Sequence, residues 1–333
     1  MPELTVVLIS KNQEWNIARL IESVLEQTSS VESCEIILVD SASTDQTTEI
    51  ASQYPITVLK LSADQHLGPA AGRYVGYKHT SGKFVLFLDG DNEMYPGWFE
   101  KGWNVLKNEP NYAVVTGPRV PLLTKATDKD KPALIDPPVS DAEDAVHSGG
   151  TAMFRRDVLE KVGTFNPYLY SDEEPELAVR IRHAGYRIKY LAHPIAYDYT
   201  DPIDEIPTKI ARWKRNLYLG AGQNLRYHLG TETFWMYLRE RGFGIIPLFG
   251  ALVGLGAFIG GVISGNFLLI GLWSLVLILF IIFDMIRKRS WYLATVSLVH
   301  RLLILDGTVR GFIKKPLAPT SYPGKHEVVR GSK

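Results

Sequence analysis

Apolar and polar positions alternate in a regular way along the first 200 residues. Short apolar runs lie at 5–10, 35–40, 56–61 and 83–89, and the segments between them carry apolar residues at helical spacing. Such alternation predicts strands joined by crossover helices, and hence a mostly parallel sheet with helices on both faces. We therefore expect an α/β fold of the doubly wound type.

Polar residues stand at the points where several of these runs end. They are Ser10, Lys11, Asn12, Asp40, Ser41, Asp89 and Asp91. Open parallel sheets bind ligands beyond the carboxyl ends of their strands. These side chains should therefore converge on one crevice.

The turn Asp89-Gly90-Asp91 follows an apolar run. Two carboxylates that flank a glycine can hold a hard divalent cation, which keeps other coordination positions for phosphate oxygens. Ordinary turn chemistry is the alternative. The position of this turn after a predicted buried strand favours a site for Mn²⁺ or Mg²⁺.

Asp40 ends another of the runs, and its carboxylate could accept hydrogen bonds from a base or a ribose. Capping of the following helix is the alternative role for an acidic residue at this point. We assign the cap to Ser43, Thr44 or Asp45 and the ligand role to Asp40.

The segment 66–80 is rich in small residues that would let a helix end approach a ligand closely, namely Gly68, Ala71, Gly72 and Gly76. Arg73 is available in the same segment for a phosphate group. Close packing of a helix on the sheet explains the same glycines, and both explanations stay open.

Four carboxylates gather just ahead of a predicted amphipathic helix, at Asp172, Glu173, Glu174 and Glu176. Repulsion between acidic groups in a cleft lets one of them act as a general base, and Glu174 is our candidate. Glu176 is better explained as a negative charge that complements the helix dipole.

Two stretches have no strand pattern. Residues 121–147 are rich in Pro, Asp and Lys, which indicates an active-site loop or lid. Residues 206–229 interleave basic and aromatic side chains, as a helix at a membrane surface does. A solvated helix packed on the catalytic domain is the alternative for the second stretch.

Two apolar segments, 243–264 and 267–286, are each long enough to span a bilayer and are joined as a tight hairpin. Basic residues on both flanks place both ends of the chain in the cytoplasm. Buried core helices are the alternative. From residue 291 we expect a basic interfacial helix, with a partial third membrane segment left open, and from about Ser321 a disordered tail.

The resulting organisation has four regions. They are a catalytic domain at 1–200, amphipathic interface helices at 201–240, a transmembrane hairpin at 241–288, and a basic helix with a flexible tail at 289–333.

Composition narrows the function classes. Acidic and basic residues balance at 36 each, which argues against a nucleic-acid partner. The single Cys34 excludes an internal disulfide, fits a reducing compartment and is expected to be a small buried side chain. The N-terminus lacks the basic and long apolar regions of a cleavable signal.

The order and spacing of the motifs resemble the family-2 glycosyltransferases with the GT-A fold. The resemblance covers about residues 4–190 and rests on the opening strand and helix at 5–24, the aspartate turn at 35–47, the glycine-arginine helix and Asp-x-Asp strand at 66–91, and the acidic segment at 147–188. It implies a GT-A sheet, which the interfacial helix and the two-helix hairpin predicted above would follow.

The resemblance also implies roles for single residues. Asp89 and Asp91 would bind the diphosphate and the metal, and Glu174, in the pair Glu173-Glu174, stands where the family has its catalytic aspartate. His193 is the nearest candidate for a third metal contact, with a structural histidine as the alternative. The donor-binding residues expected in all are Ser10, Asn12, Asp40, Ser41, Gly68, Arg73, Asp89, Gly90, Arg212 and Trp213.

We therefore expect an inverting, metal-dependent glycosyltransferase at the cytoplasmic membrane face. Its donor would be a nucleotide sugar, a UDP-sugar before a GDP-sugar, and its acceptor a lipid-linked or envelope glycan. The alternatives are a subunit of a processive polysaccharide synthase, a nucleotidyltransferase and a non-catalytic membrane scaffold. Membrane lipids are expected partners, and self-association or envelope-assembly partners stay open.

The polysaccharide synthases of the family carry a Gln-x-x-Arg-Trp motif. Lys209 stands here in place of the glutamine, ahead of Arg212 and Trp213. This departure argues against processive synthesis, while both later residues remain candidates for contact with donor or acceptor.

Overall fold

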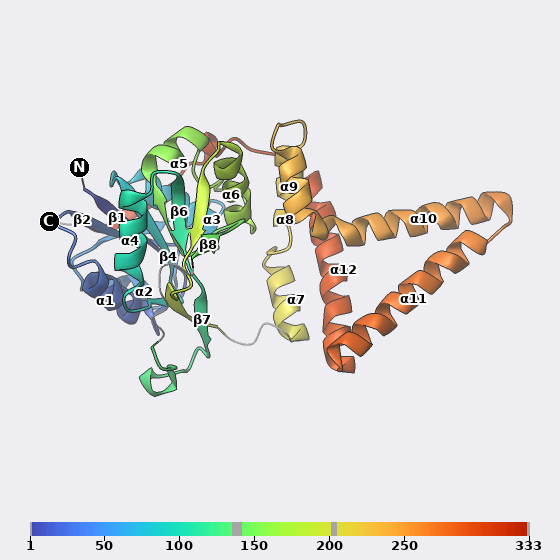
Figure 1. Cartoon of the computed structure of the whole chain (residues 1–333), viewed down its shortest axis with the longest axis horizontal. Coiled ribbons are helices and arrows are strands. Elements are labelled where there is room, and N and C mark those ends of the chain that lie inside the picture. Colours follow the sequence, from blue (N-terminus) through green and yellow to red (C-terminus); the bar gives the residue numbers. More distant parts are fainter. Residues whose placement is uncertain (1, 135–141, 201–204, 332–333) are drawn as a thin grey trace. The chain divides into compact units, whose positions relative to one another are not determined.

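The chain forms two compact units. The computed structural model describes residues 2–134, 142–200 and 205–331. Residues 1–201 together with 317–333 make up the first, which we call the sheet unit, and residues 202–316 make up the second, the helical unit (Figure 1). The predicted loop at 121–147 and the domain boundary at 200 fall partly outside the described residues.

The sheet unit is built on a nine-stranded sheet with the order β12-β3-β2-β1-β4-β9-β6-β10-β8. Its four adjacent parallel strands are β3 (Thr57–Leu61), β2 (Cys34–Asp40), β1 (Leu4–Ser10) and β4 (Phe84–Asp89). The others are β6 (Tyr112–Thr116), β8 (Glu143–Asp144), β9 (Ala152–Arg155), β10 (Arg187–Tyr190) and β12 (His326–Arg330). The parallel strands expected from the apolar runs are thus confirmed. Strands that are apolar on both sides are stable only when both faces of the sheet are covered.

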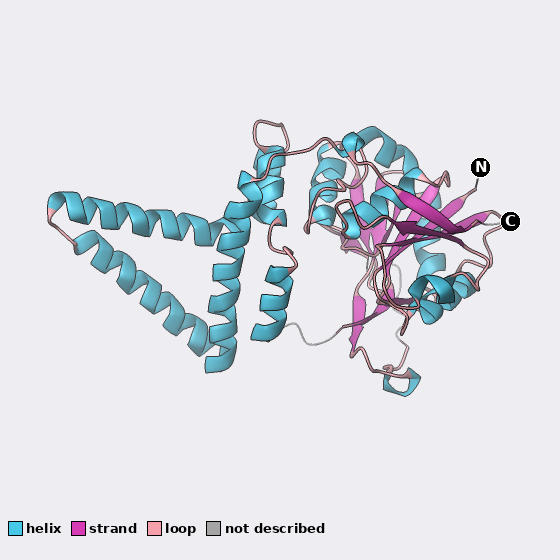
Figure 2. Cartoon of the chain, turned by 180° about the vertical axis from the view of Figure 1, so that it is seen from behind, coloured by secondary structure: helices cyan, strands magenta, loops and turns pink. Residues whose placement is uncertain are grey.

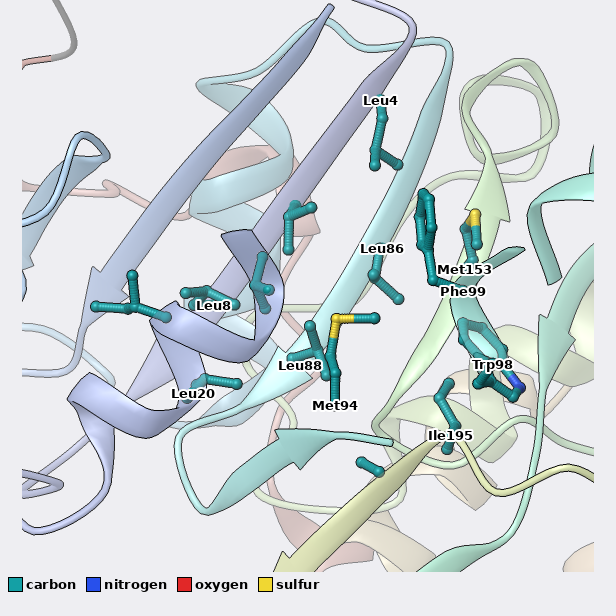
Figure 3. Packing of buried hydrophobic residues seen from close by; sticks show 14 of the residues in the cluster. Leu4, Leu8, Leu20, Leu86, Leu88, Met94, Trp98, Phe99, Met153 and Ile195 are labelled. Carbon is teal, nitrogen blue, oxygen red and sulfur yellow. The ribbon is translucent and has the colours of Figure 1, made fainter. Parts of the chain in front are cut away.

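Helices cover both faces of this sheet, as predicted. They are α1 (Ile17–Gln27), α2 (Thr47–Ala51), α3 (Pro69–Lys78), α4 (Trp98–Asn108), α5 (Arg156–Val162) and α6 (Glu173–His183). Leu20 of α1 and Trp98 and Phe99 of α4 pack with Leu8 and Leu86 on one face (Figure 3). Side chains of α3, α5 and α6 form a second apolar cluster with the opposite face of the strands.

Strand register brings the ends of the parallel strands together. Ser10 at the end of β1 pairs with Asp40 at the end of β2, and Ile9 pairs with Asp89 at the end of β4. Beyond this edge lies a small sheet with the order β5-β11-β7, made of Asn92–Met94, Ala196–Tyr199 and Arg119–Leu122. The predicted convergence of strand-end residues is therefore observed for Ser10, Asp40 and Asp89.

Residues 319–330 contain a turn and a strand, which corrects the disorder expected from about Ser321. After a 3-10 turn, η4 (Pro319–Ser321), the strand β12 pairs antiparallel with β3, with Glu327 opposite Lys60. The sequence after residue 321 has no long apolar run to announce this strand. Its partner β3 lies more than 250 residues earlier in the sequence. A local sequence pattern cannot reveal such a pairing.

The helical unit contains α7 (Ile206–Lys214), α8 (Gly220–His228), α9 (Phe234–Arg241), a 3-10 turn at Gly242–Ile245, α10 (Ile246–Ser264), α11 (Leu268–Lys288) and α12 (Trp291–Ile313). Figure 2 shows that this part of the chain is helical, in contrast to the strands of the sheet unit. Three of these helices, α10, α11 and α12, are long and apolar enough to cross a membrane. This corrects the expected number of candidate spans from two to three.

Helices α8 and α12 approach each other very closely. A Cβ atom added at Gly222 of α8 would overlap the carbonyl oxygen of Thr308, and one added at Gly307 or Gly311 of α12 would overlap the backbone carbonyls of Tyr218 and Leu219. Backbone atoms cannot move aside as side chains do. The glycines therefore set the distance between the two helices.

We predict that Gly222→Ala destabilises the helical unit by about 1–3 kcal/mol, because overpacking at a helix contact forces backbone shifts. The midpoint of thermal unfolding of the detergent-solubilised protein should fall by several degrees. Gly256→Ala on α10 is the matched control, since no atom lies within 4 Å of its added Cβ. Equal midpoints for the two variants would contradict the close contact.

Candidate active site

The centre of the site is a buried arginine surrounded by carboxylates. Arg73 of α3 is 1% exposed. Its Nη1 donates to Glu173 at 2.7 Å and its Nη2 to Asp89 at 2.5 Å, and Nη2 lies 3.8 Å from a carboxylate oxygen of Glu174. The guanidinium was predicted to be available for phosphate. It instead joins α3, β4 and α6 through their acidic residues.

Gly150 allows this cluster to form. A Cβ atom there would lie 2.5 Å from Arg73 Nη2, 2.6 Å from Asp89 Oδ2 and 3.0 Å from Glu174 Oε1. The predicted metal-binding aspartate and the predicted base therefore face the same small space. Any side chain at position 150 would fill that space.

The two glutamates of the predicted catalytic pair differ in their surroundings. The Glu173 side chain is 5% exposed and that of Glu174 is 20% exposed. Burial, with repulsion from the neighbouring Glu174, raises the pKa of Glu173, although the contact with Arg73 opposes this shift. Glu173 is thus enclosed beside Arg73, whereas Glu174 is the more exposed member of the pair.

The Asp89-Gly90-Asp91 turn is held by asparagine side chains. Asn16 donates to the carbonyl oxygens of Gly90 and Asn92, both at 2.9 Å. The buried amide of Asn92 lies 3.3 Å from Asp91 and 3.4 Å from Asp198 of β11. Asp198 was not predicted, because only the pairing of β11 with β5 brings it beside this turn.

Asp91 lies in an environment that is short of positive charge. Burial, with repulsion from Asp89 and Asp198, raises the pKa of Asp91 to about 7. Arg119 opposes this shift, and its Nη1 lies 3.3 Å from Asp198. An added cation would relieve this repulsion.

The donor atoms fit a divalent metal that arrives with a phosphate-bearing ligand. Asp89 and Asp91 offer hard oxygen ligands of the kind that Mn²⁺ and Mg²⁺ accept. In the part of the chain that the structure describes, no three His, Cys, Asp or Glu side chains gather closely enough to hold a metal by themselves. Mg²⁺ in particular is usually held by one or two carboxylates together with water and substrate phosphates.

Asp40 lies at the same edge of the sheet but is turned inward. It is fully buried and accepts hydrogen bonds from the Ser43 backbone N–H at 2.8 Å, from the Ser43 hydroxyl, and from the Ser10 hydroxyl at 3.3 Å. Burial raises its pKa, and the bonds from Ser43 oppose this shift. In this arrangement Asp40 organises the loop after β2.

The loops after β1 and β2 are tied to each other. The Asn12 N–H donates to the Ser43 hydroxyl at 2.8 Å, and the Thr44 N–H donates to the Asn12 side chain at 2.9 Å. Asn12 adopts a left-handed conformation with φ 54°. The Asp45 carboxylate accepts from the Thr47 N–H, but the N-cap position of α2 belongs to Gln46, which makes no side-chain cap bond, so none of the three predicted capping residues is the cap.

The remaining predicted residues are more scattered. Ser41 is buried beside Ser10, whose carbonyl accepts its N–H at 2.8 Å, and Gly68 precedes α3. His193 is buried and its Nε2 bonds to the Pro96 carbonyl at 2.8 Å, which favours the structural role over metal binding. Arg212 and Trp213 belong to α7 of the helical unit.

Trp213 is engaged within its own unit. Its indole N–H donates to Asp306 of α12 at 2.6 Å, and Arg310 lies over its ring. Its described contacts therefore explain it as a packing residue between α7 and α12. A role at the donor or acceptor stays a prediction.

Comparison with known proteins identifies a glycosyltransferase. Residues 5–163, somewhat less than half of the chain, match the family described as Glycosyl transferase family 2. This part of the chain is therefore a family-2 glycosyltransferase domain. The match ends before α6, so Glu173 and Glu174 lie outside it.

Curated relatives carry the same assignment. The glycosyltransferase AglE of Haloferax volcanii is 26% identical over 231 residues, which span 67% of this chain and 73% of AglE. An uncharacterised glycosyltransferase of Haemophilus influenzae is 33% identical over 116 residues, which span 34% of this chain and 38% of that protein.

Solved structures share the fold. The mannosyltransferase PcManGT of Pyrobaculum calidifontis, solved with GDP-Man and Mn²⁺, aligns with a TM-score of 0.60 at 17% identity and covers 95% of this chain and 88% of PcManGT. Residues 1–349 of S. aureus TarS with UDP-GlcNAc align with a TM-score of 0.50 at 18% identity, covering 98% of this chain and 96% of that one. At these identities the likeness shows the GT-A fold alone.

We predict that Gly150→Ala lowers sugar transfer about 100-fold, because the added methyl group displaces Asp89 and Glu174 from each other. The measurement is release of nucleoside diphosphate by purified protein at saturating donor. Gly331→Ala, whose added Cβ meets no atom within 4 Å, is the control and should match the wild type. Wild-type turnover in Gly150→Ala would refute the importance of this space.

Proposed function

We propose that the chain is an inverting, metal-dependent glycosyltransferase that transfers a sugar from a nucleotide-sugar donor to a lipid-linked or envelope-glycan acceptor at the cytoplasmic face of a membrane. The observation that carries this proposal is the gathering of Asp89, Glu174 and Arg73 around Gly150 at the carboxyl end of β4. A metal-binding carboxylate and a base are there within reach of one donor sugar.

In this proposal Glu174 is the general base. It takes the proton of an acceptor hydroxyl while the oxygen attacks the anomeric carbon from the face opposite the leaving diphosphate. Arg73 and Glu173 act as a buried support, because their ion pair fixes α6 relative to α3.

Asp89 and Asp91 would hold Mn²⁺ or Mg²⁺ together with the diphosphate. When bound, the metal supplies positive charge that stabilises the leaving group. The charge excess around Asp91 supports this assignment. Asp198 adds negative charge to the same site, and Asn92 holds it in place.

The nucleotide would lie over the loops after β1 and β2, where Ser10, Asn12, Asp40 and Ser41 meet. Because Asp40 is turned inward, its role would be to shape the loop whose backbone meets the base and ribose. The two similar structures bind GDP-Man and UDP-GlcNAc. We therefore keep a UDP-sugar and a GDP-sugar as the candidate donors.

Relatives favour an envelope glycan as the product. They include the minor teichoic acid biosynthesis protein GgaB of Bacillus subtilis and the succinoglycan biosynthesis protein ExoO of Rhizobium meliloti, 29% and 31% identical over 113 and 97 residues. Processive synthesis has less support, since Lys209 replaces the glutamine of the synthase motif. A scaffold would not require the buried arginine and carboxylates.

Strand pairing supports an even number of membrane crossings. β12 follows the three apolar helices in the sequence, yet it pairs with β3 in the sheet that contains β1 and β4. Strands of one sheet lie on one side of a membrane. We therefore propose that two of the three candidate helices cross the membrane.

The helix that stays out is α12 in this proposal. It is the least apolar of the three, and its C-terminal half packs on α8, a helix that buries Gln223 and Asn224. The crossing pair is then α10 and α11. Basic residues lie on both sides of this pair, Arg239 and Arg241 before it and Arg287, Lys288 and Arg289 after it. They favour a cytoplasmic location for both ends of the hairpin.

The proposed chemistry predicts that one nucleotide sugar binds only with Mn²⁺ or Mg²⁺ and releases its nucleoside diphosphate in the presence of acceptor. Asp91→Asn should abolish metal-dependent binding, because it removes one charged ligand. Glu174→Gln should keep donor binding and lower turnover about 10²–10⁴-fold, the usual contribution of a general base.

Donor binding is measured by calorimetry with a panel of UDP- and GDP-sugars, and turnover by nucleotide release. Glu100→Gln, at an exposed position of α4, is the charge-matched control and should behave as the wild type. Binding of no donor in any metal would overturn the nucleotide-sugar assignment. Full turnover in Glu174→Gln would remove Glu174 as the base.

The proposed topology predicts opposite labelling of the hairpin turn and the C-terminal strand. In a Cys34→Ala background, Ser264→Cys should react with an impermeant maleimide only from the extracytoplasmic side of sealed vesicles. Glu327→Cys on β12 and Glu100→Cys on α4 should react only from the cytoplasmic side. Reaction of Glu327→Cys from the extracytoplasmic side would mean three crossings and would contradict the proposal.

A further inference from the structure

A segment near the C-terminus lies against the loops that lead into both active-site helices. We call residues 317–325, between the helical unit and β12, the strap. Within the sheet unit the strap contacts residues 62–66, ahead of α3, and Tyr168, ahead of α6. Arg73 lies on α3 and Glu174 on α6, so the strap touches the supports of both residues.

Tyr322 is the centre of these contacts. It is buried, and its hydroxyl donates to the His66 carbonyl at 2.6 Å. Its ring packs edge-on against Tyr74 at 6.0 Å between centroids and against Tyr168 at 5.5 Å. Tyr74 is the residue next to Arg73 in α3, and Tyr168 stands five residues before the start of α6.

Further contacts hold the segment ahead of α6 to the strap and to the segment ahead of α3. The Ser321 hydroxyl lies 3.2 Å from that of Tyr168. The ring of His66 packs edge-on against Tyr170 at 4.4 Å. Asp172, which caps α6, adopts a left-handed conformation with φ 57°, so the path of the chain into Glu173 is sharply bent.

The segment ahead of α3 is fixed by backbone bonds to the end of the strap. The Ser62 N–H donates to the Lys325 carbonyl at 2.9 Å, and the Lys325 N–H donates to the Gln65 side chain at 3.0 Å. Lys325 also pairs with Asp64 at 2.7 Å. Gly324, with φ 57°, makes the turn that leads from Tyr322 into β12.

We propose that Tyr322 is a positioning residue of the transferase. It holds α3 and the approach to α6 against each other, so that Arg73, Asp89 and Glu174 converge around Gly150. The proposal rests on the proposed function, since the geometry that it protects is that of the base and the donor. The role is one of alignment, because the ring contacts Tyr74 and Tyr168 rather than the acidic cluster itself.

The size of the expected effect follows from the geometry. Loss of the ring leaves a cavity between α3 and the loop before α6, and the glutamate carboxylate needs to move only about 1 Å to lose about 100-fold in rate. Donor binding depends on the loops after β1 and β2 and on Asp89 and Asp91, at the end of β4 and in the turn after it. None of these contacts Tyr322 through a described interaction. Turnover should therefore fall while donor affinity stays the same.

The test compares Tyr322→Ala, Tyr322→Phe and Val328→Ala in the full-length protein. Val328, 60% exposed on β12, is the control for the strand itself. For Tyr322→Ala we expect a kcat lowered about 10–100-fold, unchanged donor affinity, and faster amide hydrogen exchange at residues 66–73 and 168–174. Tyr322→Phe, which keeps the ring, should retain most of the wild-type kcat. Val328→Ala should match the wild type.

Three outcomes would overturn the proposal. One is a kcat in Tyr322→Ala that falls only as far as the folded fraction falls, judged by thermal unfolding. Another is an equal loss in Val328→Ala, and the third is unchanged hydrogen exchange ahead of α3 and α6. If Tyr322→Ala does not fold, Tyr322→Leu replaces it, with the same expected loss of kcat at unchanged donor affinity.

Hydrogen exchange separates this proposal from the proposed function, because it needs no substrate. A wild-type protein that binds and turns over no donor would refute the transferase activity. Unchanged exchange in a Tyr322→Ala protein that is otherwise folded would refute the role of the strap.

Discussion

The guanidinium of Arg73 is buried among three carboxylates, and the arrangement of the sheet unit follows from the need to neutralise it. A buried charge without partners is costly, and removal of one partner of a buried pair typically costs about 3–5 kcal/mol. Because the partners come from β4 and α6, these elements are held to α3 by electrostatics as well as by apolar packing. The acidic residues proposed to act in catalysis and metal binding are the same groups that satisfy this charge.

This constraint explains the small residues that surround the arginine. Gly72 and Gly76 let α3 lie directly on β1, where an added Cβ would press on Ile9 and Val7, and Gly150 leaves the space in front of the guanidinium open. From the sequence alone, Gly72 and Gly76 could serve either helix packing or the approach of a ligand. For Gly72 and Gly76 the contacts are with strand side chains, so packing is the reason, whereas Gly150 faces the acidic groups.

The parts of the fold and site that were predictable are those set by local pattern. The strands β1 to β4 are continuous apolar runs, and the Asp-Gly-Asp turn and the acidic start of α6 are readable from neighbouring residues. Asp198, the strap and the pairing of Arg73 with Glu173 were not predictable, because each depends on residues about 100 or more positions apart in the sequence. The inward turn of Asp40 was missed because it reflects hydrogen bonds from Ser43 in the loop after β2 and from Ser10 at the end of β1.

The return of the chain to β12 means that the helical unit is an insertion within the sheet unit rather than an appendage at its end. A shortened chain that stopped before α10 would lose the strap and the outermost strand, and β3 would become an open edge prone to pair with other chains. A fragment of the sheet unit alone would instead require excision of the helical unit and a short bridge that joins the two ends of the sheet unit. In modular terms, the sheet unit is the host and the helical unit, with its three apolar helices, is the guest.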